Sequence, residues 1–292
     1  MILYFGQNNK LFCRINLLTL GKEENMEEMI ILAKDNRVAK IILNKPKSYH
    51  AFDLEMISHF GDIMISLATD RLVDAIIITG TGKAFCAGGD LNWTLHFKEG
   101  LPAAFHELSS RFHQAILEIR RMSKPVIAAI NGIAAGGGFS LALACDFRIM
   151  AKSAALQQGF TSNGLSMDGG ATFALPRIVG LARALEIAAF DKPITAEQAL
   201  SWGLITHIAD DGNVVAEAES LARKILQGSI FSFGRSKQLL TDSFDSSFET
   251  QIQKERQALF SCAAHGDGRE GLKAFLEKRK PEFNKDRQAR NA

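Results

Sequence analysis

The sequence predicts an α/β fold with a helical C-terminal extension, and two observations support this prediction. Through the first two thirds of the chain, short β-rich runs alternate with helix-forming segments, the order that produces a sheet covered by helices. After Pro176 the strand signals nearly vanish, and helical patterning continues to the end. We therefore divide the 292 residues into an N-terminal appendage (1–25), an α/β core (26–192) and a helical C-terminal region (193–292).

The core opens with a predicted β-hairpin. Residues 29–33 and 38–43 are β-rich runs, and the turn-forming residues 34–37 separate them. Apolar residues at helical spacing predict a helix over 54–68, and a short apolar run predicts a buried strand over 75–79.

A second set of alternating elements follows a glycine-rich loop. A long amphipathic helix is predicted near 103–122 and a buried strand at 126–130. Three consecutive glycines then open a helix over 136–145, and a strand follows at 147–150. Downstream of these elements, only a brief β-rich run at 204–208 interrupts the helical pattern.

Composition excludes several classes of protein. The chain is 47% hydrophobic, which supports a packed core, and its formal net charge of +2 gives no electrostatic case for nucleic acid. No apolar run approaches the roughly 18 residues of a membrane span. The four cysteines, Cys13, Cys86, Cys145 and Cys262, lie far apart without a Cys-x-x-Cys pair. This spacing favours neither a disulfide framework nor a metal site, and we expect a reducing, cytoplasmic location.

The first residues differ from the rest of the chain. Residues 1–25 hold two short apolar runs broken by polar residues. A secretory signal has a basic start, one apolar block and a small-residue cleavage site, and this stretch has none of these features. The first convincing structural pattern begins near Met26, so we interpret residues 1–25 as an appendage that precedes the fold.

Two segments of the core share one design: a buried strand, then small residues, then a glycine turn. The first leads from 75–79 to Gly88 and Gly89, and the second leads from 126–130 to the glycines at 136–138. In the second segment the glycines lie at a helix N-terminus, where unpaired N–H groups favour an anion. Neither segment has the spacing of a dinucleotide-binding or phosphate-binding loop. One such turn is often a packing device, whereas two in this order predict an oxyanion site.

Five motifs in the same order along the chain resemble the enoyl-CoA hydratase/isomerase (crotonase) superfamily, over about 29–283. These motifs lie at 43–47, 83–91, 130–138, 175–180 and 270–281. The resemblance implies a spiral of ββα units, assembled as homotrimers or dimers of trimers. It also implies an acyl-CoA thioester as substrate, with coenzyme A as part of that substrate and no prosthetic group.

The resemblance also implies a set of site residues. The N–H groups of Gly89 and Gly137 would form an oxyanion hole for the thioester carbonyl. The C-terminal region would cap the pocket of its own subunit or of a neighbour, and would build the trimer. By position, the residues of the coenzyme A path would be Lys47, Ser48, Ala87, Asp90 and Leu91, and the nucleotide contacts would be Phe260 and Lys278.

Three positions distinguish this chain from the hydratases that it resembles. Those enzymes use two glutamates, and Ser140 and Phe160 occupy these positions here. A carboxylate appears instead at Asp168, in a glycine-rich turn before a helix, where the pattern alone favours an N-cap. Several enoyl-CoA isomerases, including the ring-epoxide and oxepin-CoA isomerases of phenylacetate breakdown, carry their single acid/base carboxylate at this position. Our leading hypothesis is therefore an isomerase that moves a proton between two carbons through Asp168.

Three alternatives stay open. The first is an enoyl-CoA hydratase of fatty-acid or aromatic-acid degradation, which would activate water through Asp168 or another group. The second is a dehalogenase-type hydrolase, which pairs a nucleophilic aspartate with a Trp and a His. Phe160 stands where that Trp would be, and the sequence reveals no His partner. The third is a non-catalytic scaffold that binds CoA esters.

His106 and His113 share one face of the helix at 103–122, and we interpret this face as solvated or as an interface, with pocket lining as the alternative.

Overall fold

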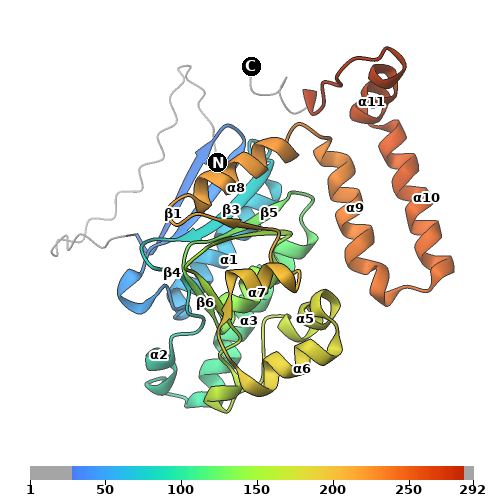
Figure 1. Cartoon of the computed structure of the whole chain (residues 1–292). Helices are drawn as coiled ribbons and strands as arrows, with labels where there is room; N and C mark the ends of the chain where they lie inside the picture. The colour runs from blue at the N-terminus through green and yellow to red at the C-terminus, as the bar shows by residue number, and fades with distance from the viewer. Residues whose placement is uncertain (1–27, 286–292) are drawn as a thin grey trace, which may run out of the picture.

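A computed structural model describes residues 28–285 (Figure 1). Six strands form the larger sheet, in the order β1-β2-β3-β5-β7-β10. Only the β1–β2 pair is antiparallel, and the other neighbours run parallel. The bounds are β1 Ile30–Asp35, β2 Val38–Leu43, β3 Ala75–Gly80, β5 Val126–Ile130, β7 Phe147–Ala151 and β10 His207–Ala209. Every residue of β3 and β5 is buried, as expected for central parallel strands with helices on both faces.

A second sheet of very short strands lies beside the first, in the order β4-β6-β8-β9. Its strands are β4 Ala84–Cys86, β6 Ile133–Ala135, β8 Ala155–Gln157 and β9 Ile194–Thr195. Three times in succession, the chain passes from a strand of the larger sheet to a strand of this one and then into a helix. This repetition is the ββα spiral that the resemblance implied, and the predicted fold class is confirmed.

The helices cover the sheets and continue into the C-terminal third of the chain. Helices α1 and α3 pack against each other beside the larger sheet (Figure 1). The α-helices are α1 Leu54–Thr69, α2 Leu91–Leu95, α3 Leu101–Arg121, α4 Gly137–Ala144, α5 Ala171–Val179, α6 Leu181–Phe190, α7 Ala196–Ser201, α8 Val214–Ile225, α9 Ile230–Asp242, α10 Phe248–Ala264 and α11 Gly266–Leu276. The short 3-10 helices are η1 Pro46–Ser48, η2 Thr161–Asn163 and η3 Ser243–Asp245.

Most long elements match their predicted ranges. The hairpin, the helix at 54–68 and the strands at 75–79, 126–130 and 147–150 are all present within a residue or two. The strand predicted at 204–208 is displaced, because the residues that pair with β7 are His207–Ala209. None of the second sheet was predicted, since strands of two or three residues carry no recognisable periodicity.

The three-part division of the chain stays a prediction. Residues 1–25 lie outside the described residues. Beyond residue 192, the chain still adds β9 and β10 to the two sheets, and α8 packs on β3, β5 and β7. The helices that extend away from the sheets begin with α9, and α10 and α11 form an outer layer beside it (Figure 1).

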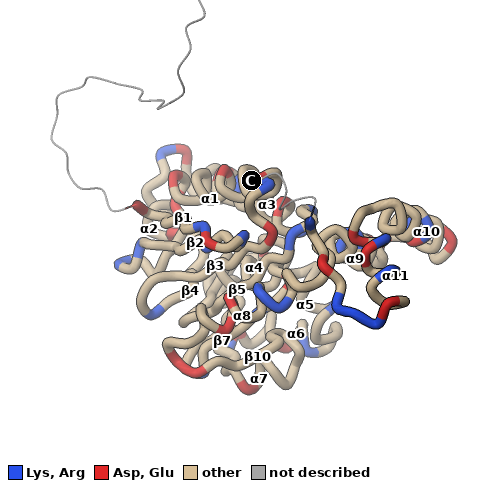
Figure 2. Tube along the Cα trace, turned by 90° about the horizontal axis from the view of Figure 1, so that it is seen from above, with Lys and Arg blue, Asp and Glu red and all other residues tan. Residues whose placement is uncertain are grey.

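Charge is spread over the molecule. Figure 2 shows basic and acidic segments interspersed around the trace, without one side that holds a single sign. Within residues 28–285, no helix is both long and apolar enough to cross a membrane.

Candidate active site

The two glycine turns meet in space. A side-chain β-carbon placed on Gly88 would come within 2.6 Å of the Gly137 nitrogen, and one on Gly137 would lie 3.4 Å from the Gly88 Cα. The chain turns at Gly88 with φ +92° and at Gly136 with φ +54°, a backbone region that favours glycine. Glycine is therefore required here for two reasons, namely the positive φ and the close approach of two backbones.

Each turn presents a backbone amide without an internal acceptor. Among the described residues, neither the Gly89 N–H nor the Gly137 N–H donates a hydrogen bond to the protein. Gly137 is the first residue of α4, where the helix leaves its first N–H groups unpaired and its dipole favours negative charge. The two N–H groups are thus available to an oxygen that develops charge.

The Gly89 turn is held from both sides by backbone hydrogen bonds to Phe52. The Phe52 N–H donates to the Gly88 carbonyl at 2.7 Å, and the Asp90 N–H donates to the Phe52 carbonyl at 2.8 Å. The Asp90 carboxylate accepts from the Trp93 N–H at 3.0 Å and thereby caps α2. Because these bonds bracket Gly89, its amide is fixed before any ligand binds.

Lys45 connects this turn to α1. Its ammonium lies 2.7 Å from the carboxylate of Asp53, the N-cap of α1, and 3.2 Å from that of Asp90. Burial alone would lower the pKa of Lys45, yet the two carboxylates raise it above its ordinary value. Burial would also raise the pKa of Asp90, but the Trp93 N–H and the Lys45 ammonium hold it below its usual range.

A cavity of about 430 Å³ opens beside the two amides. Gly89, Gly137 and Asp168 all line it, and Asp168 is the only carboxylate among its lining residues. The remaining lining residues are mostly apolar, namely Phe52, Ile57, Phe105, Leu108, Ser109, Phe112, Phe160, Leu165, Ser166 and Met167. This chamber, here called the acyl cavity, combines an apolar lining with a few polar groups, as small-molecule sites do.

Asp168 does not cap a helix, contrary to what its local pattern favours. Helix α5 begins at Ala171, its N-cap is Gly170, and no side chain caps it. The Asp168 carboxylate instead lies 2.6 Å from Nε2 of His113. The hydroxyl of buried Ser140 donates to the Asp168 carbonyl at 2.7 Å and holds the backbone of this turn.

His113 is the residue beside Asp168 that the sequence interpretation considered for the pocket only as an alternative. Its side chain is 49% exposed, as a solvated face would have it, and its imidazole also contacts Asp168, which fits the pocket lining that was kept as the alternative. The statement that Asp168 has no His partner is corrected by the same contact. The seven-residue spacing of His106 and His113 shows which helix face they share, but it does not show what lies opposite that face.

Comparison with known proteins identifies the family. A family model described as enoyl-CoA hydratase/isomerase matches residues 33–287. The chain belongs to the enoyl-CoA hydratase/isomerase family. It is 34% identical over 259 residues to a 1,2-epoxyphenylacetyl-CoA isomerase of Escherichia coli strain K12, a match that covers 88% of this chain and 99% of that protein. It is 33% identical to a crotonyl-CoA hydratase of Syntrophomonas wolfei, over 88% of this chain and 98% of that protein.

Solved structures agree with this assignment. An enoyl-CoA hydratase from Bacillus anthracis superimposes with a TM-score of 0.82 at 32% identity, over 88% of this chain and 99% of that chain. Another enoyl-CoA hydratase, from Polaromonas sp. JS666, superimposes with a TM-score of 0.83 at 30% identity, over 87% of this chain and 99% of that chain. Because its relatives are enoyl-CoA isomerases and hydratases, the protein is an enzyme of the isomerase or lyase type that acts on CoA thioesters.

The residues expected along the coenzyme A path of this crotonase-family enzyme lie near the Gly89 turn, on η1, just after β4 and at the start of α2. Lys47 is exposed on η1, and Leu91 is 44% exposed at the first position of α2. The Ala87 N–H donates to the Tyr49 carbonyl at 2.9 Å, and the Ser48 hydroxyl lies 3.4 Å from the Lys45 carbonyl. The contacts of Lys47, Ser48, Ala87, Asp90 and Leu91 with coenzyme A stay predictions.

Asp90 has a structural role that the prediction did not include. Its carboxylate caps α2 and pairs with Lys45, its N–H bonds Phe52, and its carbonyl accepts from the Thr94 N–H at 3.0 Å. Each polar group of Asp90 therefore has a protein partner, and together these bonds position Gly89.

His50, three residues after the motif at 43–47, is buried and hydrogen-bonded on both ring nitrogens. Nδ1 accepts from the Lys45 N–H at 2.9 Å, so Nε2 carries the hydrogen that is donated to the Thr81 carbonyl at 2.8 Å. Burial lowers the pKa of His50, which favours this neutral form. His50 thus connects the backbone at Lys45 to the backbone at Thr81, and it does not line the acyl cavity.

The two proposed nucleotide contacts lie on the outer helices. Phe260 is on α10 and is 76% exposed, and Lys278 follows the end of α11. Neither residue lines the acyl cavity of its own chain. Their contact with a CoA ester, in the same or a neighbouring subunit, stays a prediction.

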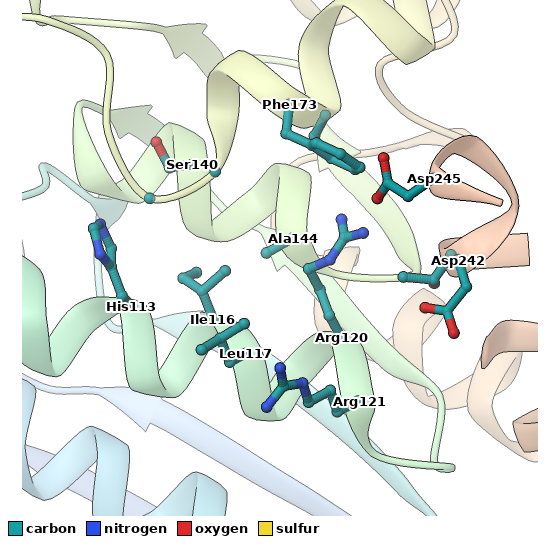
Figure 3. A pocket seen from close by; sticks show the side chains of 14 residues that line it. His113, Ile116, Leu117, Arg120, Arg121, Ser140, Ala144, Phe173, Asp242 and Asp245 are labelled. Atoms are coloured by element: carbon teal, nitrogen blue, oxygen red, sulfur yellow. The ribbon is translucent and has the colours of Figure 1, made fainter.

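A second cavity, of about 490 Å³, is lined in part by Gly169 and Gly170, which follow Asp168 (Figure 3). His113 and Arg120 extend into it from α3, Phe173 extends from α5, and Asp242 and Asp245 lie on the opposite side. Within residues 28–285, no group of three or more His, Cys, Asp or Glu side chains is arranged to hold a metal ion.

Proposed function

We propose that the protein is an enoyl-CoA isomerase that shifts a double bond by proton transfer through Asp168. One observation carries this proposal: Asp168 is the only carboxylate that lines the cavity holding the Gly89 and Gly137 amides. A single carboxyl group suits isomerisation, because it can remove a proton from one carbon and return it two carbons away. The isomerase relative from Escherichia coli supports this choice.

The proposed reaction begins with a 3-enoyl-CoA whose thioester carbonyl accepts hydrogen bonds from Gly89 and Gly137. Asp168 removes a proton from C2, and the electron pair of that C–H bond enters a dienolate. The two amides stabilise the oxygen of the dienolate, and losing one such donor costs roughly 2.7–4 kcal/mol. Asp168 then protonates C4, which gives the 2-enoyl-CoA and restores the carboxylate.

Hydration fits this site less well. Two-carboxylate hydration needs acids at the positions of Ser140 and Phe160, and Phe160 contributes only an apolar ring to the acyl cavity. The Ser140 hydroxyl is already engaged with the Asp168 carbonyl. The crotonyl-CoA hydratase relative keeps hydration as the runner-up.

The proposal includes an assembly in the cytoplasm. We propose a homotrimer, or a dimer of such trimers, in which α10 and α11 cap a cavity and bring Phe260 and Lys278 to the nucleotide. The apolar side chains exposed on these helices support this part, since Phe260, Leu272 and Phe275 are each at least 66% exposed in the single chain.

The test is Asp168→Asn, assayed with a 3-enoyl-CoA by the conjugated absorbance of the 2-enoyl-CoA product. The amide keeps the shape of the side chain but does not take up a proton, so kcat should fall by about 10²–10⁴-fold. Binding of a saturated acyl-CoA should be unchanged. Asp62→Asn, on the exposed face of α1, is the matched control and should be fully active.

Other outcomes would identify the alternatives. Full activity of Asp168→Asn would contradict the role of this carboxylate. Conversion of a 2-enoyl-CoA to a 3-hydroxyacyl-CoA as the main reaction would support the hydratase. Binding of both esters without conversion would support a scaffold.

The contact between His113 and Asp168 favours a second candidate function, a dehalogenase-type hydrolase. Such enzymes pair a nucleophilic aspartate with a histidine, and these two side chains lie 2.6 Å apart here. The ring of Phe160, in place of the Trp, argues against it. Release of chloride from a chlorobenzoyl-CoA would support this function, and no release would exclude it.

A further inference from the structure

Asp168 and His113 lie at the boundary between the two cavities. Asp168 lines the acyl cavity but not the second cavity, and His113 lines the second cavity but not the acyl cavity. Their side chains meet with Nε2 of His113 2.6 Å from Oδ1 of Asp168. This contact therefore lies between the acyl cavity and the second cavity.

The backbone on both sides of the contact is closely packed. A side-chain β-carbon on Gly169 would lie 2.3 Å from a ring carbon of Phe112, the residue before His113 on α3. The Ser140 hydroxyl holds the Asp168 carbonyl at 2.7 Å. The turn that carries Asp168 is thus pressed against the helix that carries His113, which keeps the two side chains in reach of each other.

The two sides of the boundary differ in polarity. The rings of Phe112 and Phe160 line the acyl cavity together with Asp168, whereas the charged Arg120, Asp242 and Asp245 line the second cavity. The His113 side chain is 49% exposed. We expect water to reach this pair from the second cavity, where the charged side chains lie, when an acyl chain fills the acyl cavity.

We propose that His113 is a proton relay between Asp168 and the water of the second cavity. The inference rests on the proposed isomerase function. After Asp168 has taken the C2 proton, this proton passes to Nε2 of neutral His113, leaving a carboxylate beside an imidazolium. The half-exposed imidazolium turns Nε2 from Asp168 to the water of the second cavity, gives this proton to water and accepts a solvent proton at the same nitrogen. It then turns back and returns the solvent proton to the carboxylate. Asp168 then delivers a solvent-derived proton to C4, and His113 and Asp168 are restored.

A relay differs measurably from a side chain that only orients Asp168. An orienting residue affects the rate of turnover but not the origin of the hydrogen at C4. A relay determines that origin, because without it the proton removed from C2 stays on the carboxyl group until C4 takes it. The substitution His113→Gln separates the two roles, since its amide can donate to Asp168 but does not carry a proton onward.

The experiment is turnover of a 3-enoyl-CoA in deuterated water, with deuterium at C4 of the product measured by mass spectrometry at low conversion. In the unaltered protein, most product molecules should carry deuterium at C4. Loss of a positioned proton-transfer group slows that transfer by roughly 10²–10⁴-fold, so in His113→Gln the deuterated fraction should fall by about tenfold or more. His106→Gln, two turns earlier on the same helix, is the matched control and should leave that fraction unchanged.

Each result has a distinct meaning. Equal deuterium at C4 with and without His113 would overturn the relay and leave the isomerase proposal intact. Little deuterium at C4 in the unaltered protein would also overturn it. If no 3-enoyl-CoA is converted by the unaltered protein, the proposed function itself is contradicted.

Discussion

Helices α1 and α10 are nearly equal in length but differ in what they bury. α1 has 16 residues and buries seven of them against the larger sheet and α3. α10 has 17 residues and buries none. Its apolar side chains are nevertheless large, and Leu259 and Phe260 are 72% and 76% exposed. Burial of apolar side chains in the α/β core therefore supplies the folding free energy of the single chain. The apolar side chains of α10 stay exposed in the single chain and are free to pack against another surface.

Polar contacts join the outer helices to the core. Lys237 of α9 is buried, and its ammonium bonds the Ile119 carbonyl at 2.7 Å and the Asp146 carboxylate at 2.8 Å. Farther out, Asp267 of α11 accepts from the Ser229 hydroxyl at 2.6 Å and from the Asn284 N–H at 2.7 Å. These directional bonds set where α9 and α11 lie, without the broad apolar packing that holds α1.

The largest effect should come from the core. Phe60 on α1 is fully buried, 5.7 Å from the ring of Phe52. Phe60→Ala leaves a cavity that its neighbours fill only in part, so the free energy of unfolding should fall by about 3–5 kcal/mol. Phe275→Ala on α11, where the ring is 81% exposed, is the comparison and should change it by less than about 0.5 kcal/mol. Urea unfolding of both variants checks this, and equal losses would refute the contrast between the two regions.

An intermediate effect on stability is expected at Gly138, in the first turn of α4, which packs closely against the backbone of Cys86. A β-carbon on Gly138 would lie 2.0 Å from the backbone oxygen of Cys86, which does not move aside as a flexible side chain does. Gly138→Ala should therefore destabilise the protein by about 1–3 kcal/mol and displace the Gly137 amide, with loss of activity.

The control for this substitution is another helical glycine. A β-carbon on Gly61, in α1, meets nothing within 4 Å. Gly61→Ala should raise the free energy of unfolding by about 0.5–1 kcal/mol, because alanine loses less conformational entropy in a helix. Thermal unfolding of the two variants measures both changes in stability. A stable, active Gly138→Ala variant would contradict the packing argument.

The smallest effect on the unfolding of the single chain should come from α10. Phe260→Ala should change the free energy of unfolding by less than about 0.5 kcal/mol at low protein concentration. If the proposed homotrimer forms over this surface, the same variant should associate more weakly, and sedimentation velocity measures that. Unchanged association would argue against burial of Phe260 between copies.

Part of the fold followed directly from the sequence. Strands β2 and β5 were predicted residue for residue, because β2 is a β-rich run beside a turn and β5 is a continuous apolar run between turn signals. Strands β6 and β8 were missed, since three residues are too few to show a period. Their pairing is set by contacts between distant parts of the chain, which local pattern does not contain.

The candidate site was predicted to a similar degree. The resemblance placed Gly89, Gly137 and Asp168 in one pocket, and all three line the acyl cavity. The sequence did not assign His113 to the site, because its partner is 55 residues away, on a turn whose position depends on tertiary packing. The N-cap expected from the pattern at Asp168 was wrong because α5 starts three residues later, at Ala171.

The link that Lys45 makes between two helix caps has a consequence for tolerance to acid. Because the pKa of Asp90 is depressed in the folded protein, its contribution to stability is present above the ordinary carboxyl pKa and is lost only as the pH falls through the lowered value. The Lys45 ammonium stays charged throughout that range, since its own pKa is raised. The turn that positions the Gly89 amide should therefore persist through mild acidification.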